Sequence, residues 1–137
     1  MNNDAQDFEQ FMKQREDASQ AFVEGDAEPL EQVATHTSPA SIFGPQGDYV
    51  VGADEVNAAN KRGAEHFAPG SKNRFDILHM AASNGVAYWA GIQRSAVQMK
   101  GKKDPVPMDL RVTEVFRREG DEWKLIHRHA DMLKSEA

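Results

Sequence analysis

Three residues near the C-terminus have types and spacing that could carry chemistry. His127, His129 and Asp131 alternate along a segment that reads as a β-strand. Side chains repeat every two residues along a strand, so these groups must share one face of a sheet. An imidazole oriented by a carboxylate can act as a general base, and we assign this role to His129, held by Asp131 or Asp109. Arg111 on the preceding strand is the assigned anion stabiliser, because a guanidinium can clamp a carboxylate or enolate.

The same pattern of histidines and aspartate has two other interpretations. Two imidazoles and a carboxylate on one face can bind a metal ion, but zinc or iron would need further ligands. His36 and His66 are expected near helix ends rather than beside this strand, so we predict neither a metal site nor a cofactor. The third interpretation, which is the more ordinary one, is that the histidines are hydrogen-bonded and line a pocket or a dimer interface.

The residues that face these histidines depend on the turn of the last predicted hairpin, within 106–133. A two-residue turn at 119–120 gives the histidines apolar partners: Val112 with His127 and Leu110 with His129. One additional turn residue gives a polar set: Thr113 with His127, Arg111 with His129 and Asp109 with Asp131. A shift of one residue moves a whole set of side chains to the other face. We favour the polar set, because buried polar groups need hydrogen-bond partners.

Six side chains are candidates for ligand binding: His127, Thr113, Glu114, Trp89, Phe43 and Tyr49. Aromatic walls suit a planar organic ligand, although an aromatic residue in a sheet more often belongs to the core. Glu114 stands among apolar neighbours. If that face lines a pocket, burial would raise the pKa of Glu114 and fit it to act as an acid. If the face packs between subunits, Glu114 would pair with Arg128 or Arg94.

The periodicity of the chain predicts an α+β fold. Apolar residues at helical spacing predict three helices, from residue 3 or 4 to Gly25, from 26 to 33, and from 54 to 67 before Pro69-Gly70. Short strands are expected at 40–43 and 49–51. From residue 72 the apolar pattern alternates, and Asn84-Gly85 predicts a tight turn between two long strands. We expect the helices to pack on one face of a strongly curved antiparallel sheet and to leave a concave pocket.

Composition limits the classes of function. A chain of 137 residues predicts one domain, spanning residues 1–137, and its net charge of −6 disfavours nucleic acid as a partner. The absence of cysteine excludes disulfides and thiolate chemistry. No run of 18 apolar residues predicts a membrane span, and the N-terminus lacks the pattern of a signal peptide. We therefore expect a soluble cytoplasmic protein.

Four segments resemble a known family: 40–45 (ASIFGP), Gly52 before a helix, 86–89 (VAYW) and 123–129 (WKLIHRH). With the order of helices and strands, they resemble the SnoaL-like branch of the nuclear transport factor two-like superfamily over nearly the whole chain. The resemblance implies a cone-shaped α+β half-barrel with an internal pocket, usually a homodimer through the outer sheet face. The superfamily includes ketosteroid isomerases, polyketide cyclases, dehydratases and a calmodulin-dependent kinase association domain, so its motifs specify fold better than function.

The sequence departs from the ketosteroid isomerase pattern at the catalytic positions. The position of that family's general base is Gly44, and its oxyanion-hole tyrosine aligns near Ala18. Its protonated aspartate aligns near Thr113 or Glu114. Loss of the base and of a hydrogen-bond donor removes two large contributions to the rate, so we do not expect steroid isomerisation.

Three functional hypotheses follow. The first is a cofactor-free cyclase, isomerase or dehydratase that acts on a small carbonyl or carboxylate compound. The second is a non-catalytic protein that binds a small carboxylate or aromatic metabolite. The third is a dimerisation or assembly domain.

Overall fold

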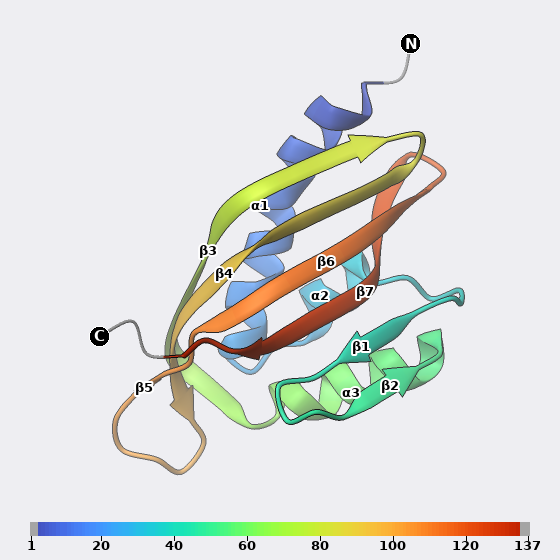
Figure 1. Cartoon of the computed structure of the whole chain (residues 1–137). Helices are drawn as coiled ribbons and strands as arrows, with labels where there is room; N and C mark the ends of the chain where they lie inside the picture. The colour runs from blue at the N-terminus through green and yellow to red at the C-terminus, as the bar shows by residue number, and fades with distance from the viewer. Residues whose placement is uncertain (1–2, 135–137) are drawn as a thin grey trace.

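The computed structural model describes residues 3–134 and has the predicted α+β fold (Figure 1). Residues 1–2 and 135–137 of the predicted domain lie outside the described residues. The helices are α1 (Asp4–Val23), α2 (Glu28–Val33) and α3 (Ala53–Ala64). The strands are β1 (Ser41–Phe43), β2 (Tyr49–Val51), β3 (Phe67–Ser83), β4 (Val86–Met99), β5 (Val106–Pro107), β6 (Leu110–Glu119) and β7 (Glu122–Met132).

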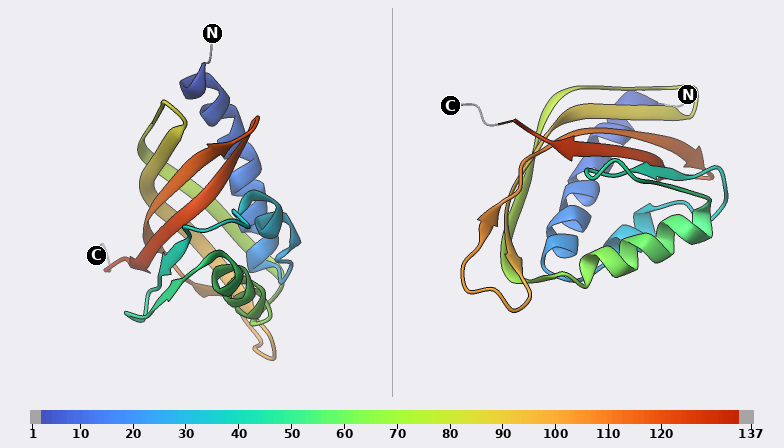
Figure 2. Two further views of the ribbon diagram at one scale, coloured as in Figure 1. Left: turned by 90° about the vertical axis from the view of Figure 1, so that its right-hand side faces the viewer. Right: turned by 60° about the horizontal axis from the view of Figure 1, so that its bottom comes forward.

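Within residues 3–134, the strands form one curved sheet in the order β2-β1-β7-β6-β4-β3, with β5 paired to β4. The helices lie together on its concave side, which makes the cone-shaped half-barrel (Figure 2). The predicted antiparallel sheet has one parallel pair, because β1 runs parallel to β7. These two strands are far apart in sequence, so no tight hairpin forces them to run in opposite directions.

Helix α1 packs against the concave face of the sheet with an apolar stripe. Its first turn is capped by Asn3, whose side chain accepts a hydrogen bond from the backbone of Gln6. Phe8 and Met12 recur at helical spacing, and they belong to the same buried cluster as Trp123. The main core therefore lies between α1 and the concave face of the sheet.

The hairpin from β3 to β4 forms as predicted at Asn84-Gly85. Both residues have positive φ, 55° and 80° respectively, which suits a tight two-residue turn. The start of β3 differs from the prediction: α3 ends at Ala64, and Pro69-Gly70 lie inside the strand. The strand register shifts between Ala68 and Lys72, and proline is tolerated at such irregular positions.

The last hairpin has neither predicted register. Its turn is Gly120-Asp121, and a β-bulge at Ile126 adds one residue to β7. The observed pairs on the histidine face are Val115 with His127, Thr113 with His129 and Arg111 with Asp131. The favoured pairs of Thr113 with His127, Arg111 with His129 and Asp109 with Asp131 were therefore wrong by two residues. The bulge was not foreseen, although the prediction that Thr113 and Arg111 share the histidine face is confirmed.

Candidate functional site

A cavity of about 470 Å³ lies between the sheet and the helices. This volume is in the range of small-molecule sites, about 300–1,000 Å³. Its apolar walls come from all three helices and from the sheet: Phe22, Val23, Leu30, Ala34, Ile42, Val56, Phe67, Met108, Leu110, Leu125, Ile126 and Ala130. The polar side chains at its inner end are Arg15, Ser19, Gln93 and Arg128. The cavity therefore combines an apolar body with a polar floor, and we use "floor" below for those four residues.

Glu114 lies directly beneath the floor and holds it together. The Glu114 carboxylate is fully buried and accepts four hydrogen bonds. Arg15 donates from Nε and Nη2 at 2.9 and 2.7 Å, and Arg128 donates from Nη1 at 2.7 Å. Trp89 donates from its indole nitrogen at 2.8 Å. Glu114 and Trp89, both predicted to bind ligand, thus support the floor from below and are not among the residues that line the cavity.

The prediction of a raised pKa for Glu114 was wrong. Burial by itself would raise this pKa, but the charges and hydrogen bonds of Arg15 and Arg128 outweigh it and lower the pKa to about 2. An ionised carboxylate whose oxygens are already engaged is a poor proton donor. Glu114 is therefore a structural anion in the folded protein, and the pairing with Arg128 occurs inside one chain.

A hydrogen-bonded chain of side chains extends from Arg128 across the floor. Arg128 Nη2 donates to Gln93 at 2.7 Å, and Gln93 donates to Asn73 at 2.8 Å. Asn73 in turn donates to the hydroxyl of Ser19 at 2.9 Å. Fixed partners of this kind hold side chains in one orientation, so the floor is organised before any ligand binds.

Arg15 reaches the floor because of its place on α1. It follows Met12 by three residues and precedes Ser19 by four, so it lies on the stripe that buries Phe8 and Val23. Its side chain is only 3% exposed. The sequence contained this signal: an arginine and a serine at core positions of an amphipathic helix. The apolar members of the stripe predict the helix, but they do not by themselves reveal this polar pair.

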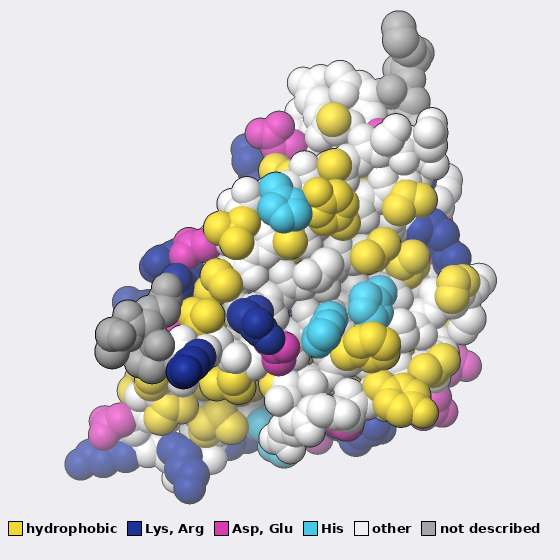
Figure 3. Space-filling model, viewed as in Figure 1, with side chains coloured by type: hydrophobic (Ala, Val, Ile, Leu, Met, Phe, Trp, Pro, Cys, Tyr) yellow, Lys and Arg dark blue, Asp and Glu magenta, His cyan; other side chains and the backbone are white. Residues whose placement is uncertain are grey.

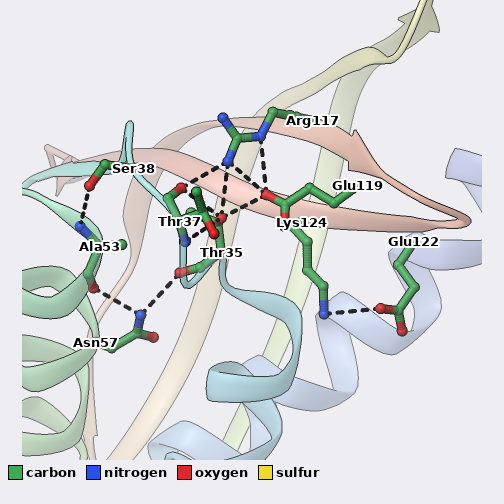
Figure 4. Close-up of polar contacts among 9 residues, drawn as sticks. All are labelled: Thr35, Thr37, Ser38, Ala53, Asn57, Arg117, Glu119, Glu122 and Lys124. Atoms are coloured by element: carbon green, nitrogen blue, oxygen red, sulfur yellow. Dashed lines mark hydrogen bonds and ion pairs between the residues drawn. The ribbon is translucent and has the colours of Figure 1, made fainter.

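A polar clamp fixes the segment that leads to β1 and α3 (Figure 4). Glu119, at the end of β6, accepts hydrogen bonds from Thr35 at 2.6 Å and from Arg117 at 2.8 Å. Arg117 also donates to the backbone oxygen of Thr37 at 2.8 Å. Asn57 of α3 donates to the backbone oxygen of Thr35 at 3.0 Å. Because β1 and α3 carry part of the cavity wall, the clamp sets where that wall stands.

The three predicted catalytic residues lie on the outer face of the sheet and are not among the lining residues. Arg111 makes a bidentate pair with Asp131, at 2.6 and 2.7 Å. The hydrogen bonds of Arg111 lower the pKa of Asp131. His129 Nε2 lies 3.8 Å from Asp131, and the His129 side chain is 51% exposed. The structure thus brings the three together, but away from the cavity.

His127 is the neighbour of His129 on the same face of β7 and is more enclosed. Its Nδ1 lies 2.8 Å from the hydroxyl of Ser41, and its ring centroid lies 4.8 Å from that of Phe43 in an edge-to-face arrangement. Burial lowers the pKa of His127, and the neighbouring His129 adds to this effect. Both His127 and Phe43 also contribute to the cavity lining, at the edge formed by β1 and β7.

The remaining predicted ligand-binding residues also lie on the outer face. Thr113 pairs with His129, and Tyr49 lies opposite Phe43 in the β1–β2 hairpin. Neither lines the cavity. On this face, histidine side chains are intermingled with hydrophobic ones (Figure 3).

Residues 13–134 match the model of the SnoaL-like domain. The chain belongs to the SnoaL-like family. This agrees with the fold and with the predicted resemblance. No curated protein matches the sequence closely enough to count as a relative.

Solved structures share the fold of this SnoaL-like protein at low sequence identity. A candidate dehydratase of the NTF2-like family from Streptomyces avermitilis is 21% identical, with a TM-score of 0.78 over 95% of this chain and 98% of that one. An NTF2-like superfamily protein from Salmonella enterica is 10% identical, with a TM-score of 0.77 over 96% and 92%. A candidate association domain of a type II calcium/calmodulin-dependent protein kinase from Thiobacillus denitrificans is 18% identical, with a TM-score of 0.68 over 88% and 93%.

The chemistry that the floor of this SnoaL-like cavity offers is hydrogen-bond donation and positive charge. Arg15, Arg128 and Gln93 can bind an oxygen-bearing group at the floor, and the walls can enclose an apolar body. Within residues 3–134, no three His, Asp or Glu side chains gather as a metal site. None of the helices in that range is long and apolar enough to cross a membrane.

Proposed function

We propose that the protein binds a small, mainly apolar organic molecule in the cavity between the helices and the sheet. The observation that carries the proposal is the cavity of about 470 Å³, with apolar walls and a floor that is already hydrogen-bonded. A large apolar cavity with a few convergent polar groups is the usual form of a small-molecule site. The SnoaL-like family supports the same function, because its fold surrounds such a pocket.

The test is binding of the neutral fluorescent probe N-phenyl-1-naphthylamine, followed by its emission and by calorimetry. Ala130 lines the cavity and is buried, so Ala130→Leu places three more carbon atoms in it. We expect saturable binding of one probe per chain, weakened about tenfold or more in Ala130→Leu, because the added carbons take the volume of the ligand.

Ala90→Leu is the matched control. It makes the same change on the outer face of β4, where Ala90 lies opposite Thr113. Probe affinity should be unchanged in this variant. Absence of saturable binding to the wild-type protein, or equal weakening by both variants, would contradict the proposal.

A reaction of the cyclase, isomerase or dehydratase class on the bound molecule stays a prediction. The candidate dehydratase from Streptomyces avermitilis supports this class only through a shared fold. The assigned residues His129, Asp131 and Arg111 would act on a substrate that reaches the outer face. Their roles are therefore tested separately from binding in the cavity.

We further propose that the outer face of the sheet is a homodimer interface. The exposed apolar side chains of Phe43, Tyr49 and Val86 are 44%, 71% and 54% accessible. Exposed apolar surface around a partly paired polar centre is typical of a protein interface. The candidate kinase association domain from Thiobacillus denitrificans also favours an assembly role for such a face. Sedimentation velocity at micromolar concentration tests the proposal, which requires a species of twice the chain mass.

A further inference from the structure

The floor of the cavity contains more positive than negative charge. Arg15 and Arg128 both contact the single carboxylate of Glu114. Within residues 3–134, no second carboxylate pairs with either guanidinium. Two cations against one anion leave one net positive charge at the floor. Asp48, in the turn between β1 and β2, also lines the cavity but pairs with neither arginine.

This excess positive charge is largely buried, where a charge is energetically unfavourable. Arg15 is 3% exposed, and Arg128, which lies on the concave face, is 19% exposed. Burial lowers the pKa of Arg128, and the nearby charge of Arg15 adds to this effect against the opposing effect of Glu114. Removing a cation from water is unfavourable unless an anion compensates it. The arrangement would gain stability from one further negative charge.

Arg15 also has a hydrogen-bond donor without an acceptor. Its Nε and Nη2 are turned to Glu114, but Nη1 is buried and has no partner among the described residues. One face of the guanidinium lies over the ring of Phe75, at 5.6 Å from the centroid. Buried donors are normally satisfied, so this unpaired nitrogen leaves the positive charge of Arg15 incompletely compensated.

We propose that the ligand is a small organic carboxylate whose carboxylate group binds at the Arg15–Arg128 pair while its apolar body fills the cavity. This inference rests on the proposed binding function and adds the chemical class of the ligand. A carboxylate presents two coplanar oxygens that match the donors of a guanidinium.

The charge and the walls favour a carboxylate over a phosphate. One negative charge balances the single excess charge of the floor. A doubly charged phosphate would leave a net negative charge in the same enclosed space. The remaining walls are mostly apolar side chains. Such a surface suits a hydrocarbon or aromatic body better than a polar one.

The experiment compares carboxylates with matched neutral alcohols in calorimetry: octanoate with octanol, and 2-naphthoate with 2-naphthol. Each pair has nearly the same apolar body, so the ratio of affinities isolates the charged group. We expect the wild-type protein to bind the carboxylates about ten- to a hundredfold more tightly, the size of a hydrogen bond to a charged group.

Arg128→Met is the informative variant. It removes one cation and leaves Glu114 with its two hydrogen bonds from Arg15 and one from Trp89, so the floor becomes neutral. The preference for carboxylates should fall at least about tenfold, while the alcohols bind as before. The control is Arg74→Met, because Arg74 is 68% exposed on β3 and is not a lining residue.

The possible results separate the carboxylate inference from the proposed pocket function. Equal binding of carboxylates and alcohols by the wild-type protein would overturn the carboxylate inference and leave the proposed pocket function in place. Binding of neither compound, together with no binding of N-phenyl-1-naphthylamine, would overturn both. A carboxylate preference that survives in Arg128→Met would place the anion elsewhere, which also rejects this site. The wild-type comparison needs no variant and therefore does not depend on how Arg128→Met folds.

Discussion

At the scale of single residues, the cavity depends on a carboxylate that holds arginines rather than on one that transfers protons. Glu114 is buried in the core of the sheet, yet it is ionised because Arg15 and Arg128 surround it. A buried ion pair of this kind costs desolvation, so it is weak evidence of stability by itself. Its observed effect is positional: it fixes both guanidiniums at the floor.

The pH dependence of stability follows from Glu114. Its pKa falls from 4.5 to about 2 on folding, so the unfolded chain takes up the proton first as the pH falls. The stabilisation is complete above pH 4.5 and is lost as the pH approaches 2. We expect the free energy of unfolding to fall by about 3 kcal/mol over this pH range because of Glu114. Urea unfolding at several pH values measures this change, which should be absent in Glu114→Gln.

The same variant measures the role of the carboxylate at neutral pH. Glu114→Gln leaves two buried cations without an anion, and we expect the free energy of unfolding to fall by about 3–5 kcal/mol. Glu122→Gln is the control, because Glu122 is 72% exposed and its ion pair with Lys124, at 3.5 Å, lies at the surface. This control should change stability by less than about 1 kcal/mol. Similar losses in both variants would show that Glu114 does not hold the floor as described.

The assignment of His129 as a general base gives a separate prediction. If the protein turns over a carbonyl or carboxylate compound through this residue, His129→Ala should lower kcat/KM at least about a hundredfold while the fold is retained. His79→Ala is the control, because His79 is also on the outer face but contacts Tyr88 instead of Asp131. A turnover rate that His129→Ala leaves unchanged rules out the assignment.

At the scale of elements, local signals were readable in the sequence and strand registers were not. Asn84-Gly85 predicts its turn because few other residue pairs adopt positive φ there. The bulge at Ile126 has no such signature, since isoleucine is also an ordinary strand residue. That one residue determines that Arg128 points into the cone and His129 outward. The floor could not be predicted for two reasons. The bulge sets the direction of Arg128, and the apolar pattern of α1 does not mark Arg15 as a buried position.

The close approach of β3 to β4 depends on Gly91. A Cβ atom at this position would lie 2.2 Å from the carbonyl oxygen of Asp76 and 3.0 Å from the Cα atom of Ile77. Both are backbone atoms, so they can give way only if β3 moves. We expect Gly91→Ala to lower the free energy of unfolding by about 2–3 kcal/mol in urea titrations.

Gly63→Ala provides the matched control. It makes the same change within α3, where the added Cβ would meet only the ring of Phe22, at 3.1 Å. A flexible ring can shift, and alanine favours a helix by about 0.5–1 kcal/mol over glycine. A loss in Gly63→Ala as large as that in Gly91→Ala would argue against backbone crowding as the cause.

At the scale of the whole molecule, the two faces of one curved sheet have different environments. Side chains alternate along each strand, so β7 directs Arg128 and Ala130 to the cavity and His129 and Asp131 to the outside, while His127 stands at the cavity edge beside β1. The order of elements was sufficient to predict this architecture, because helices gathered on one side must cover an apolar concave face. A cavity on one face leaves the other free to associate.

The proposed homodimer is tested at the middle of the outer face. Thr113 is exposed between Ala90 and His129, and Thr113→Arg adds a long charged side chain there. In a two-fold interface the same change occurs on both subunits, so like charges are buried together and association should weaken at least about a hundredfold.

Gln10→Arg on the exposed side of α1 is the control and should remain dimeric. Sedimentation velocity at about 10 μM, well within the range of ordinary dimers, distinguishes the two. A wild-type monomer, or a Thr113→Arg dimer as stable as the control, would show that the outer face is not the interface.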